Sequence, residues 1–219
     1  MRSVRIDGSV ADHLRVGIVE AEGVTVVHHG PALWVEINTI SAQLRAAHAG
    51  REPAQIEGLQ PARALYRRIG VDPTKLRPSS EALLRRVLRG DGLPSVNSLV
   101  DINNLCSLEF LLPIGLHDLD NAVGPITLRR GGPGEGYEAI GKGWYSVEGR
   151  LAAADERGAC GSPTSDSRRT MITLDTTRCL MIIYAPADCD LARLREHTEV
   201  AARRIAGFAG GTIVQAAVL

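Results

Sequence analysis

The side chains best suited to chemistry are concentrated in residues 161–170, which read Gly-Ser-Pro-Thr-Ser-Asp-Ser-Arg-Arg-Thr. The candidate site residues in this segment are Ser162, Thr164, Ser165 and Asp166. Hydroxyls and a carboxylate in one loop can orient a water molecule at a ligand carbonyl or ribose. The same residue types also form Asx- and ST-turns, in which side chains only satisfy the backbone of their own loop. The segment therefore predicts either a ligand site or a self-satisfied turn.

Other candidate catalytic groups are few. The chain has no Ser-His-Asp order and no G-x-S-x-G motif, so a serine nucleophile at Ser165 is not predicted. His117, which precedes Asp118 and Asp120, is a candidate acid or base because imidazole titrates near neutral pH. The alternative for His117 is a packed or helix-end histidine. The four cysteines form no C-x-x-C pair and no zinc-type spacing with histidine, so neither a metal site nor a cofactor is expected.

Two adjacent asparagines, Asn103 and Asn104, lie within a helix that the apolar pattern predicts over residues 96–111. Asn103 shares a helix face with Leu99 and Phe110, so its amide is expected to be partly buried. A buried amide needs hydrogen-bond partners. Both asparagines are therefore candidate substrate-binding residues.

The helices and strands that must position these groups are predicted from the spacing of apolar residues along the chain. Alternating apolar residues at Leu14, Val16 and Ile18 predict a half-buried strand. Helices are predicted at 31–49, 60–68, 79–89, 96–111 and 190–208, and further strands at 24–27, 126–130, 137–140, 147–153, 171–174, 178–184 and 212–218. The glycines at 131–136 predict a hairpin loop, because no G-x-G-x-x-G motif is present. This order predicts a single α+β domain, residues 1–219, with mixed sheets and helices in layers.

Charge limits the partners that the chain can have. Basic and acidic residues balance at 25 each, so no global positive field for non-specific nucleic-acid binding is present. Nearly all of the positive charge is arginine, which favours bidentate phosphate contacts and is compatible with a local phosphate-binding patch. The candidate residues for such contacts are Arg77, Arg129 and Arg168.

A membrane or secretory role is not expected. No apolar segment approaches the roughly 20 residues needed to cross a bilayer. The charged start of the chain lacks the apolar core of a signal peptide, which favours a cytoplasmic protein.

Several short motifs occur along the chain in an order known from one protein family. The matching segments are Arg77-Pro78-Ser79, 99–104 (L-V-D-I-N-N against L-V-D-x-T-N), 113–119 (P-I-G-L-H-D-L against P-x-H-x-F-D-L), 126–130, Gly134-Glu135 and Asp175-Thr176. Residues 70–190 thus resemble a stand-alone member of the family of the editing module in the phenylalanyl-tRNA synthetase β subunit. The resemblance implies an α+β fold of mixed sheets packed by helices, and a site that binds the 3′ end of a tRNA.

In that family the module hydrolyses tyrosine wrongly attached to phenylalanine tRNA, and a helix histidine and a strand glutamate are associated with its site. Here Asn104 matches the asparagine of the motif, and Asn103 stands in place of its threonine. Gly115 falls where the histidine is expected, with His117 two positions later, and the place of the glutamate falls near Ile182. The resemblance therefore implies a pocket that is retained with different chemistry.

Different functions remain open at this point. One is a tRNA-handling protein, either a freestanding aminoacyl-tRNA deacylase or a tRNA-binding module, with a pocket built from Thr164, Ser165 and Asp166. The alternative is a non-catalytic protein that binds a free amino acid or a nucleotide in the inherited pocket. An enzyme whose substrate has drifted away from tRNA is a third. The ordered motifs favour the first function, whereas the balanced charge and the absent histidine and glutamate favour the others.

Overall fold

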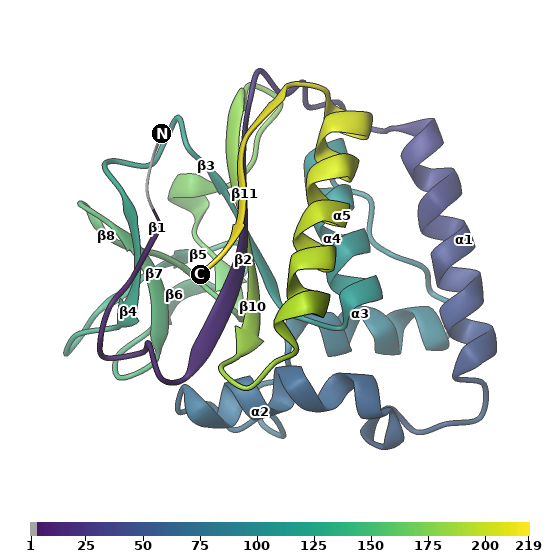
Figure 1. Cartoon of the computed structure of the whole chain (residues 1–219), viewed down its shortest axis with the longest axis horizontal. Coiled ribbons are helices and arrows are strands. Elements are labelled where there is room, and N and C mark those ends of the chain that lie inside the picture. Colours follow the sequence, from purple (N-terminus) through teal and green to yellow (C-terminus); the bar gives the residue numbers. More distant parts are fainter. Residues whose placement is uncertain (1–3) are drawn as a thin grey trace.

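The computed structural model describes residues 4–219, without the side chain of Ala54. Within this range a central sheet lies between a group of helices and a second sheet (Figure 1). The α-helices are α1 (Pro31–Ala47), α2 (Gln60–Arg68), α3 (Ser79–Leu88), α4 (Ser98–Phe110) and α5 (Leu191–Ala209), and the 3-10 helices are η1 (Pro53–Gln55), η2 (Glu57–Leu59) and η3 (Arg168–Thr170). The strands are β1 (Val4–Ile6), β2 (Leu14–Glu22), β3 (Ile114–Asp118), β4 (Ile126–Arg130), β5 (Gly136–Ala139), β6 (Gly143–Ser146), β7 (Leu151–Asp155), β8 (Gly158–Ser162), β9 (Ser165–Asp166), β10 (Arg178–Pro186) and β11 (Thr212–Val218). The predicted α+β class, with mixed sheets packed by helices, is confirmed.

The central sheet has the strand order β11-β2-β10-β3, and all of its neighbours are antiparallel. Successive side chains of β10 enter two different cores. Met181 and Ile183 pack towards the helices, whereas Ile182 and Tyr184 pack towards the second sheet. A strand covered on both faces must be apolar at nearly every position, and this explains the unbroken apolar run of β10.

The second sheet has the order β1-β4-β7-β8-β9, with β1 parallel to β4. Its inner face shares a core with the central sheet, through side chains such as Leu128, Leu151 and Cys160. The two-stranded sheet β5-β6 is attached to it by a bridge between Ala139 and Ser167. The loop between β8 and β9 is thereby held close to the junction of the two larger sheets.

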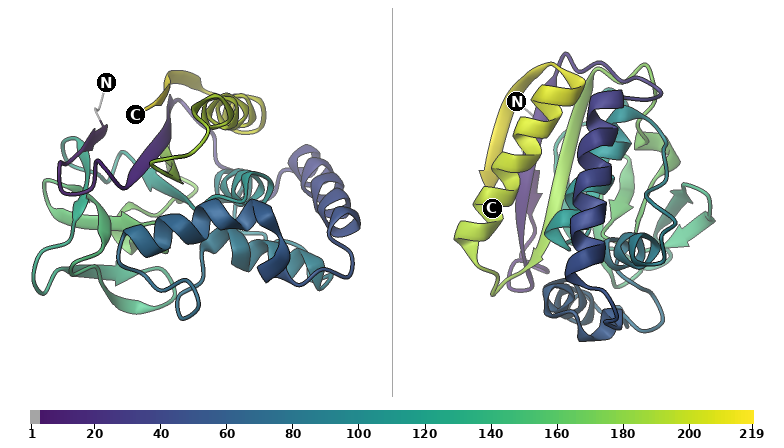
Figure 2. Two further views of the ribbon diagram at one scale, coloured as in Figure 1. Left: turned by 60° about the horizontal axis from the view of Figure 1, so that its bottom comes forward. Right: turned by 90° about the vertical axis from the view of Figure 1, so that its right-hand side faces the viewer.

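Helices α1, α3, α4 and α5 cover the opposite face of the central sheet, whereas α2 contributes Leu65 and Tyr66 to the core between the two sheets. Figures 1 and 2 show α1 on the outside of this layer, with α4 between α1 and the sheet. The side chain of Asn97 caps α4 by accepting from the amide of Val100 at 3.0 Å. Leu111 ends α4 in the left-handed conformation, with φ of 56°. No helix within residues 4–219 has the length and apolar character needed to span a membrane.

Several predicted elements are wrong. The strand beginning at Leu14 is not half-buried, because β2 lies in the middle of the sheet and is covered on both faces. Residues 24–27 form no strand: the chain turns at Gly23, with φ of 69°, and makes only isolated bonds with other segments. Residues 171–174 form no strand either. A turn is closed there by two bonds, from the Thr173 amide to the Thr176 hydroxyl and from the Thr176 amide to the Thr173 carbonyl oxygen. The glycine segment 131–136 joins strands of two different sheets and is no hairpin loop.

Candidate functional site

A polar cavity of about 120 Å³ lies where α3, α4, the start of β3 and the β8–β9 loop meet. The residues that line it are Ser79, Leu83, Asn103, Asn104, Ser107, Ile114, Ser162, Pro163, Thr164, Ser165 and Asp166. Six of the sequence-predicted site residues are therefore brought together around one cavity: Asn103, Asn104, Ser162, Thr164, Ser165 and Asp166. We call this space the Asn103–Asp166 cavity.

The loop side of this cavity is shaped by Ser162 and two tyrosines. The Ser162 hydroxyl accepts from the backbone amides of Thr164, at 3.3 Å, and Ser165, at 3.2 Å. The Tyr66 hydroxyl donates to the carbonyl oxygen of Pro163 at 2.8 Å, and that of Tyr137 donates to the carbonyl oxygen of Ser165. Ser162 thus builds the turn, as the self-satisfied interpretation predicts, and the two amides that it binds are not free to act as oxyanion donors.

Three buried polar atoms of the cavity lining have no hydrogen-bond partner within the described residues. They are the Ser79 hydroxyl oxygen, the Asn103 carbonyl oxygen Oδ1 and the Asp166 carboxylate oxygen Oδ1. A buried polar group without a partner costs about 1–3 kcal/mol, so three on one cavity are unusual in a purely structural site. Pro78 occupies the cap position of α3, so the Ser79 hydroxyl does not cap the helix. The cavity is therefore suited to a ligand that supplies donors.

Asp166 is the ionisable group of the cavity lining. Burial raises its pKa to about 7, although the backbone amide of Leu116 and the charge of Lys142 act in the opposite direction. The Oδ1 atom lies beside Gly115 and Gly161, at 3.4 and 3.5 Å from the positions that a Cβ would take there. A carboxylate with a pKa near the working pH is well matched to general-base chemistry.

His117 lies behind the cavity, on β3 and not at a helix end, and it is absent from the lining. Its Nδ1 lies 3.2 Å from the Thr170 hydroxyl, which itself donates to the carbonyl oxygen of Cys160 at 3.1 Å. Since that hydroxyl has one hydrogen, it accepts from His117, so Nδ1 carries the proton and Nε2 is an acceptor. Burial, with a smaller contribution from Arg169, lowers the pKa of His117 to about 4. The side chain is therefore neutral at pH 7.

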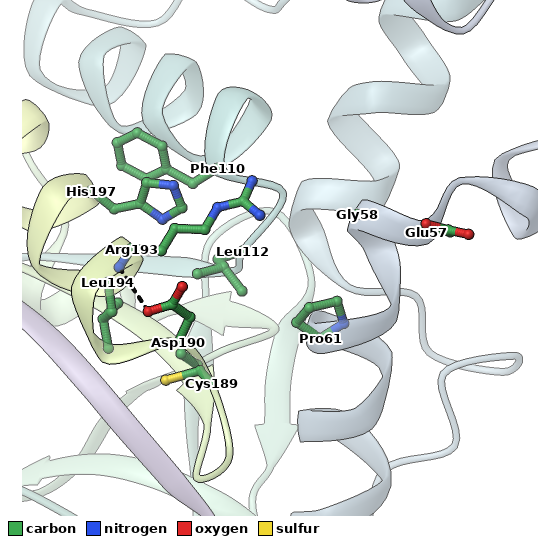
Figure 3. Close-up of a pocket in the computed structure, with 11 residues that line it drawn as sticks. Glu57, Gly58, Pro61, Phe110, Leu112, Cys189, Asp190, Arg193, Leu194 and His197 are labelled. Atoms are coloured by element: carbon green, nitrogen blue, oxygen red, sulfur yellow. Dashed lines mark hydrogen bonds between the residues drawn. The ribbon is translucent and has the colours of Figure 1, made fainter.

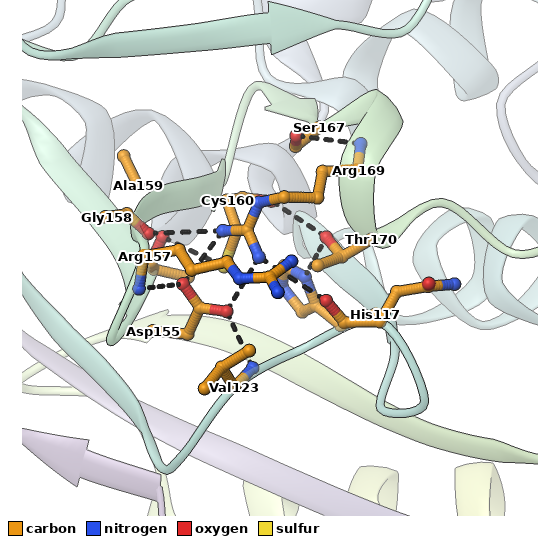
Figure 4. Close-up of polar contacts among 12 residues, drawn as sticks. His117, Val123, Asp155, Arg157, Gly158, Ala159, Cys160, Ser167, Arg169 and Thr170 are labelled. Atoms are coloured by element: carbon orange, nitrogen blue, oxygen red, sulfur yellow. Dashed lines mark hydrogen bonds and ion pairs between the residues drawn. The ribbon is translucent and has the colours of Figure 1, made fainter.

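A charge pair beside His117 holds β7, β8 and η3 together (Figure 4). The Arg169 guanidinium donates to both carboxylate oxygens of Asp155, at 2.7 and 2.8 Å. Asp155 also accepts from the amides of Val123 and Arg157. The sequence did not predict this pair, because no local pattern distinguishes Asp155 from other polar residues at the end of a strand. It also missed Tyr66, Tyr137 and Tyr184, three of only four tyrosines in the chain.

The arginines predicted to contact phosphate do not line the cavity. Arg129 makes a bidentate pair with Glu135, with both distances 2.7 Å. Arg77 lies 3.6 Å from the buried carboxylate of Glu81, which also pairs with Arg63 and Arg85. Arg168 is exposed and follows Asp166 by two residues, so among the three predicted arginines it is the free charge beside the loop.

The fold and its cavity define an α+β protein in which helices and a second sheet cover opposite faces of a central antiparallel sheet. A solved structure with this fold is an N-terminal fragment of the phenylalanyl-tRNA synthetase β subunit from Pyrococcus horikoshii. The TM-score is 0.53, with 96% of this chain and 50% of that chain covered at 14% sequence identity. This likeness shows the shared fold.

The sequence matches the B3/4 domain family over residues 61–207, and the chain belongs to that family. It is 28% identical over 109 residues to the phenylalanine–tRNA ligase beta subunit of Neisseria meningitidis serogroup B, and 33% identical over 87 residues to that of Ralstonia nicotianae. These alignments cover 49% and 39% of this chain but only 14% and 11% of the two subunits. The resemblance carried by the short motifs is confirmed.

Proposed function

We propose that this protein binds the aminoacylated 3′ end of a tRNA and hydrolyses the ester bond in the Asn103–Asp166 cavity. The observation that carries the proposal is that three residues lining one small cavity, Ser79, Asn103 and Asp166, each have a buried polar atom without a partner within the described residues. Membership of the B3/4 family, and similarity to subunits of a tRNA ligase, support tRNA as the partner.

Hydrolysis of the ester bond needs only a base for the attacking water and hydrogen-bond donors for the oxyanion. Asp166 accepts a proton from a water molecule as that water attacks the ester carbonyl carbon. The side-chain amides of Asn103 and Asn104 are the donors available to the developing oxyanion, because Ser162 already binds the amides of its own loop. The tetrahedral intermediate then expels the ribose oxygen, which takes back from Asp166 the proton that the water gave up, and the products are a free amino acid and an uncharged tRNA.

The size and polarity of the cavity select the aminoacyl group. An engineered cavity of about 150 Å³ in another protein just holds benzene. The Asn103–Asp166 cavity has about 120 Å³ and a lining rich in hydroxyls and amides. We therefore propose a small, polar aminoacyl group as the substrate, and not the tyrosine removed by the synthetase module.

Deacylation of a panel of charged tRNAs tests this proposal. We expect the protein to release serine or threonine from tRNA faster than tyrosine or phenylalanine, and Asp166→Asn to lower the rate about 100-fold or more. The matched control is Asp175→Asn, which removes an exposed carboxylate from a nearby turn and should leave the rate unchanged. Loss of activity in the control, or full activity in Asp166→Asn, would contradict the assignment.

A second candidate function is non-catalytic binding of a small molecule in the same cavity. Gly115 and Ile182 at the positions implied for the family's histidine and glutamate favour it. The deacylation panel separates the two functions, because a non-catalytic protein releases no amino acid from any tRNA. It would instead show ligand-dependent melting that Asn104→Ala weakens.

A further inference from the structure

A second cavity, of about 360 Å³, lies between the start of α5 and the start of α2 (Figure 3). The residues that line it are Glu57, Gly58, Pro61, Phe110, Leu112, Ala185, Cys189, Asp190, Arg193, Leu194 and His197. None of them lines the Asn103–Asp166 cavity. Pockets for small molecules usually begin at about 300 Å³, so this volume corresponds to a ligand of modest size.

The floor of this cavity is apolar and rigid. Phe110, Leu112, Ala185 and Leu194 are all buried. The rings of Phe110 and His197 stack with centroids 4.2 Å apart and an interplanar angle of 6°. Burial lowers the pKa of His197 to about 4, so its ring is neutral at pH 7, and its buried Nδ1 has no partner within the described residues. The floor therefore accepts a hydrocarbon group and offers one unused polar atom.

The rim of the cavity carries opposite charges one helical turn apart. Asp190 caps α5 through a single oxygen, Oδ1, which accepts from the amides of Ala192 and Arg193 at 2.9 and 3.2 Å. Its other oxygen, Oδ2, has no hydrogen-bond partner within the described residues. The exposed guanidinium of Arg193 has no ion-pair partner in residues 4–219, and Figure 3 shows it at the same rim as the Asp190 carboxylate.

We infer that this cavity binds a small zwitterion with an apolar side chain, of the size and chemistry of a free α-amino acid. An α-amino acid carries its carboxylate and its ammonium group on one carbon, which matches the close spacing of Arg193 and Asp190. The carboxylate pairs with Arg193 and the ammonium group with the free oxygen of Asp190. The side chain lies on the apolar floor formed by Leu112, Ala185 and Leu194. The inference does not depend on the function of the Asn103–Asp166 cavity.

Calorimetry and thermal melting of the whole protein with L-leucine, L-methionine and L-phenylalanine test this inference. At least one of them should bind and raise the melting temperature. 4-Methylpentanoate lacks the ammonium group of leucine, and 3-methylbutylamine lacks its carboxylate. Each should bind at least about tenfold more weakly than leucine, because each loses one charged hydrogen-bonded contact. Equal binding of the three compounds would overturn the inference.

Two conservative variants locate the ligand. Arg193→Gln removes the cation, and Asp190→Asn removes the anion while keeping a side chain that caps helices well. Both should weaken binding at least about tenfold, whereas Arg195→Gln, an exposed arginine two residues along α5, should not. Absence of binding by all three amino acids would overturn the inference. So would binding that survives Arg193→Gln and Asp190→Asn but is lost on Asn104→Ala.

Discussion

Gly115 and Ile182 are direct cross-strand partners where β3 pairs with β10. These are the two positions at which the family resemblance places a histidine and a glutamate. Paired residues project to the same face of a sheet, and here that face is the core between the two sheets, in which Ile182 is fully buried. A Cβ at Gly115 would lie 3.3 Å from the Tyr184 ring and 3.4 Å from Asp166 Oδ1. The Tyr184 ring and the Asp166 carboxylate fill this place, so neither of the family's two groups can supply acid–base chemistry from positions 115 and 182.

Gly115→His should therefore not restore removal of tyrosine from tRNA. The imidazole would overlap the Tyr184 ring, and overpacking of a core costs about 1–3 kcal/mol. Urea unfolding and deacylation of tyrosine-charged tRNA measure the two effects. Gly8→His is the control for stability, because no atom lies within 4 Å of a Cβ at Gly8. A stable Gly115→His protein that gained tyrosine release would show that this face can hold the family's histidine.

The three buried tyrosines around the β8–β9 loop should respond differently to loss of the hydroxyl. Tyr66→Phe leaves the carbonyl oxygen of Pro163 without its donor and should lower the free energy of unfolding by about 1–3 kcal/mol. Tyr137→Phe should cost less, because the carbonyl oxygen of Ser165 keeps the hydroxyl of Ser162 as a second donor. Tyr184→Phe is the matched control. Its hydroxyl has no partner within the described residues, so its removal should be neutral or stabilising. Equal losses in all three variants would contradict the bonding pattern described for the loop.

Hydrolysis should depend on pH through the carboxylate of Asp166. The base is active when ionised, so the rate should rise with pH up to about 7, the pKa of Asp166, and then level off. His117 is already neutral well below this range and should not contribute to the rise. Initial rates measured from pH 5 to pH 9, about two units on either side of that pKa, would check this. A profile that levels off below pH 5 would exclude Asp166 as the base.

The same carboxylate should make stability fall as pH rises. Its pKa is about 7 in the folded state against an ordinary 3.8, so the folded state binds the extra proton between these values. The wild type should therefore lose about 3 kcal/mol relative to Asp166→Asn as the pH rises from 4 to 7. His117 and His197, whose pKa values are lowered to about 4, act in the opposite direction in both proteins and cancel in the comparison. A difference that is independent of pH would contradict the burial of this carboxyl group.

Binding of tRNA should depend only weakly on salt. Arg129 and Arg169 are neutralised by Glu135 and Asp155, which leaves Arg168 and Lys142 as the cations near the loop without an ion pair within the described residues. Arg168→Gln should lower the slope of log affinity against log salt by about 0.7, the value for one phosphate of a single strand. Arg45→Gln, an exposed arginine in the last turn of α1, is the control and should leave the slope unchanged. A steep slope in the wild type would indicate many contacts and contradict this assignment.

Local sequence patterns predicted many of the helices and strands and several residues of the cavity lining. They did not predict the contacts that hold this lining in place. The Asn103–Asn104 pair, part of a family motif, and the loop 162–166, chosen for its hydroxyls and carboxylate, could each be identified as candidates, and both line the cavity. The bond from Tyr66 to Pro163 could not be predicted, since it joins residues 97 positions apart. His117 could not be placed on a strand either, because five residues flanked by loops carry little periodic signal. Contacts between distant segments depend on how the sheets pack together, and this packing cannot be predicted from the pattern of any single segment.

The position of β2 in the middle of the central sheet limits where the protein can be cut. The family match begins at residue 61, yet β2 ends at Glu22 and pairs with β10 along its full length and with β11 on its other side. A fragment expressed from residue 61 would lose the strand that joins these two. It would expose an unpaired edge of β10 on which strands from other copies can dock, the usual origin of insoluble material. For crystallisation, labelling or fusion, a soluble fragment must therefore begin ahead of Leu14.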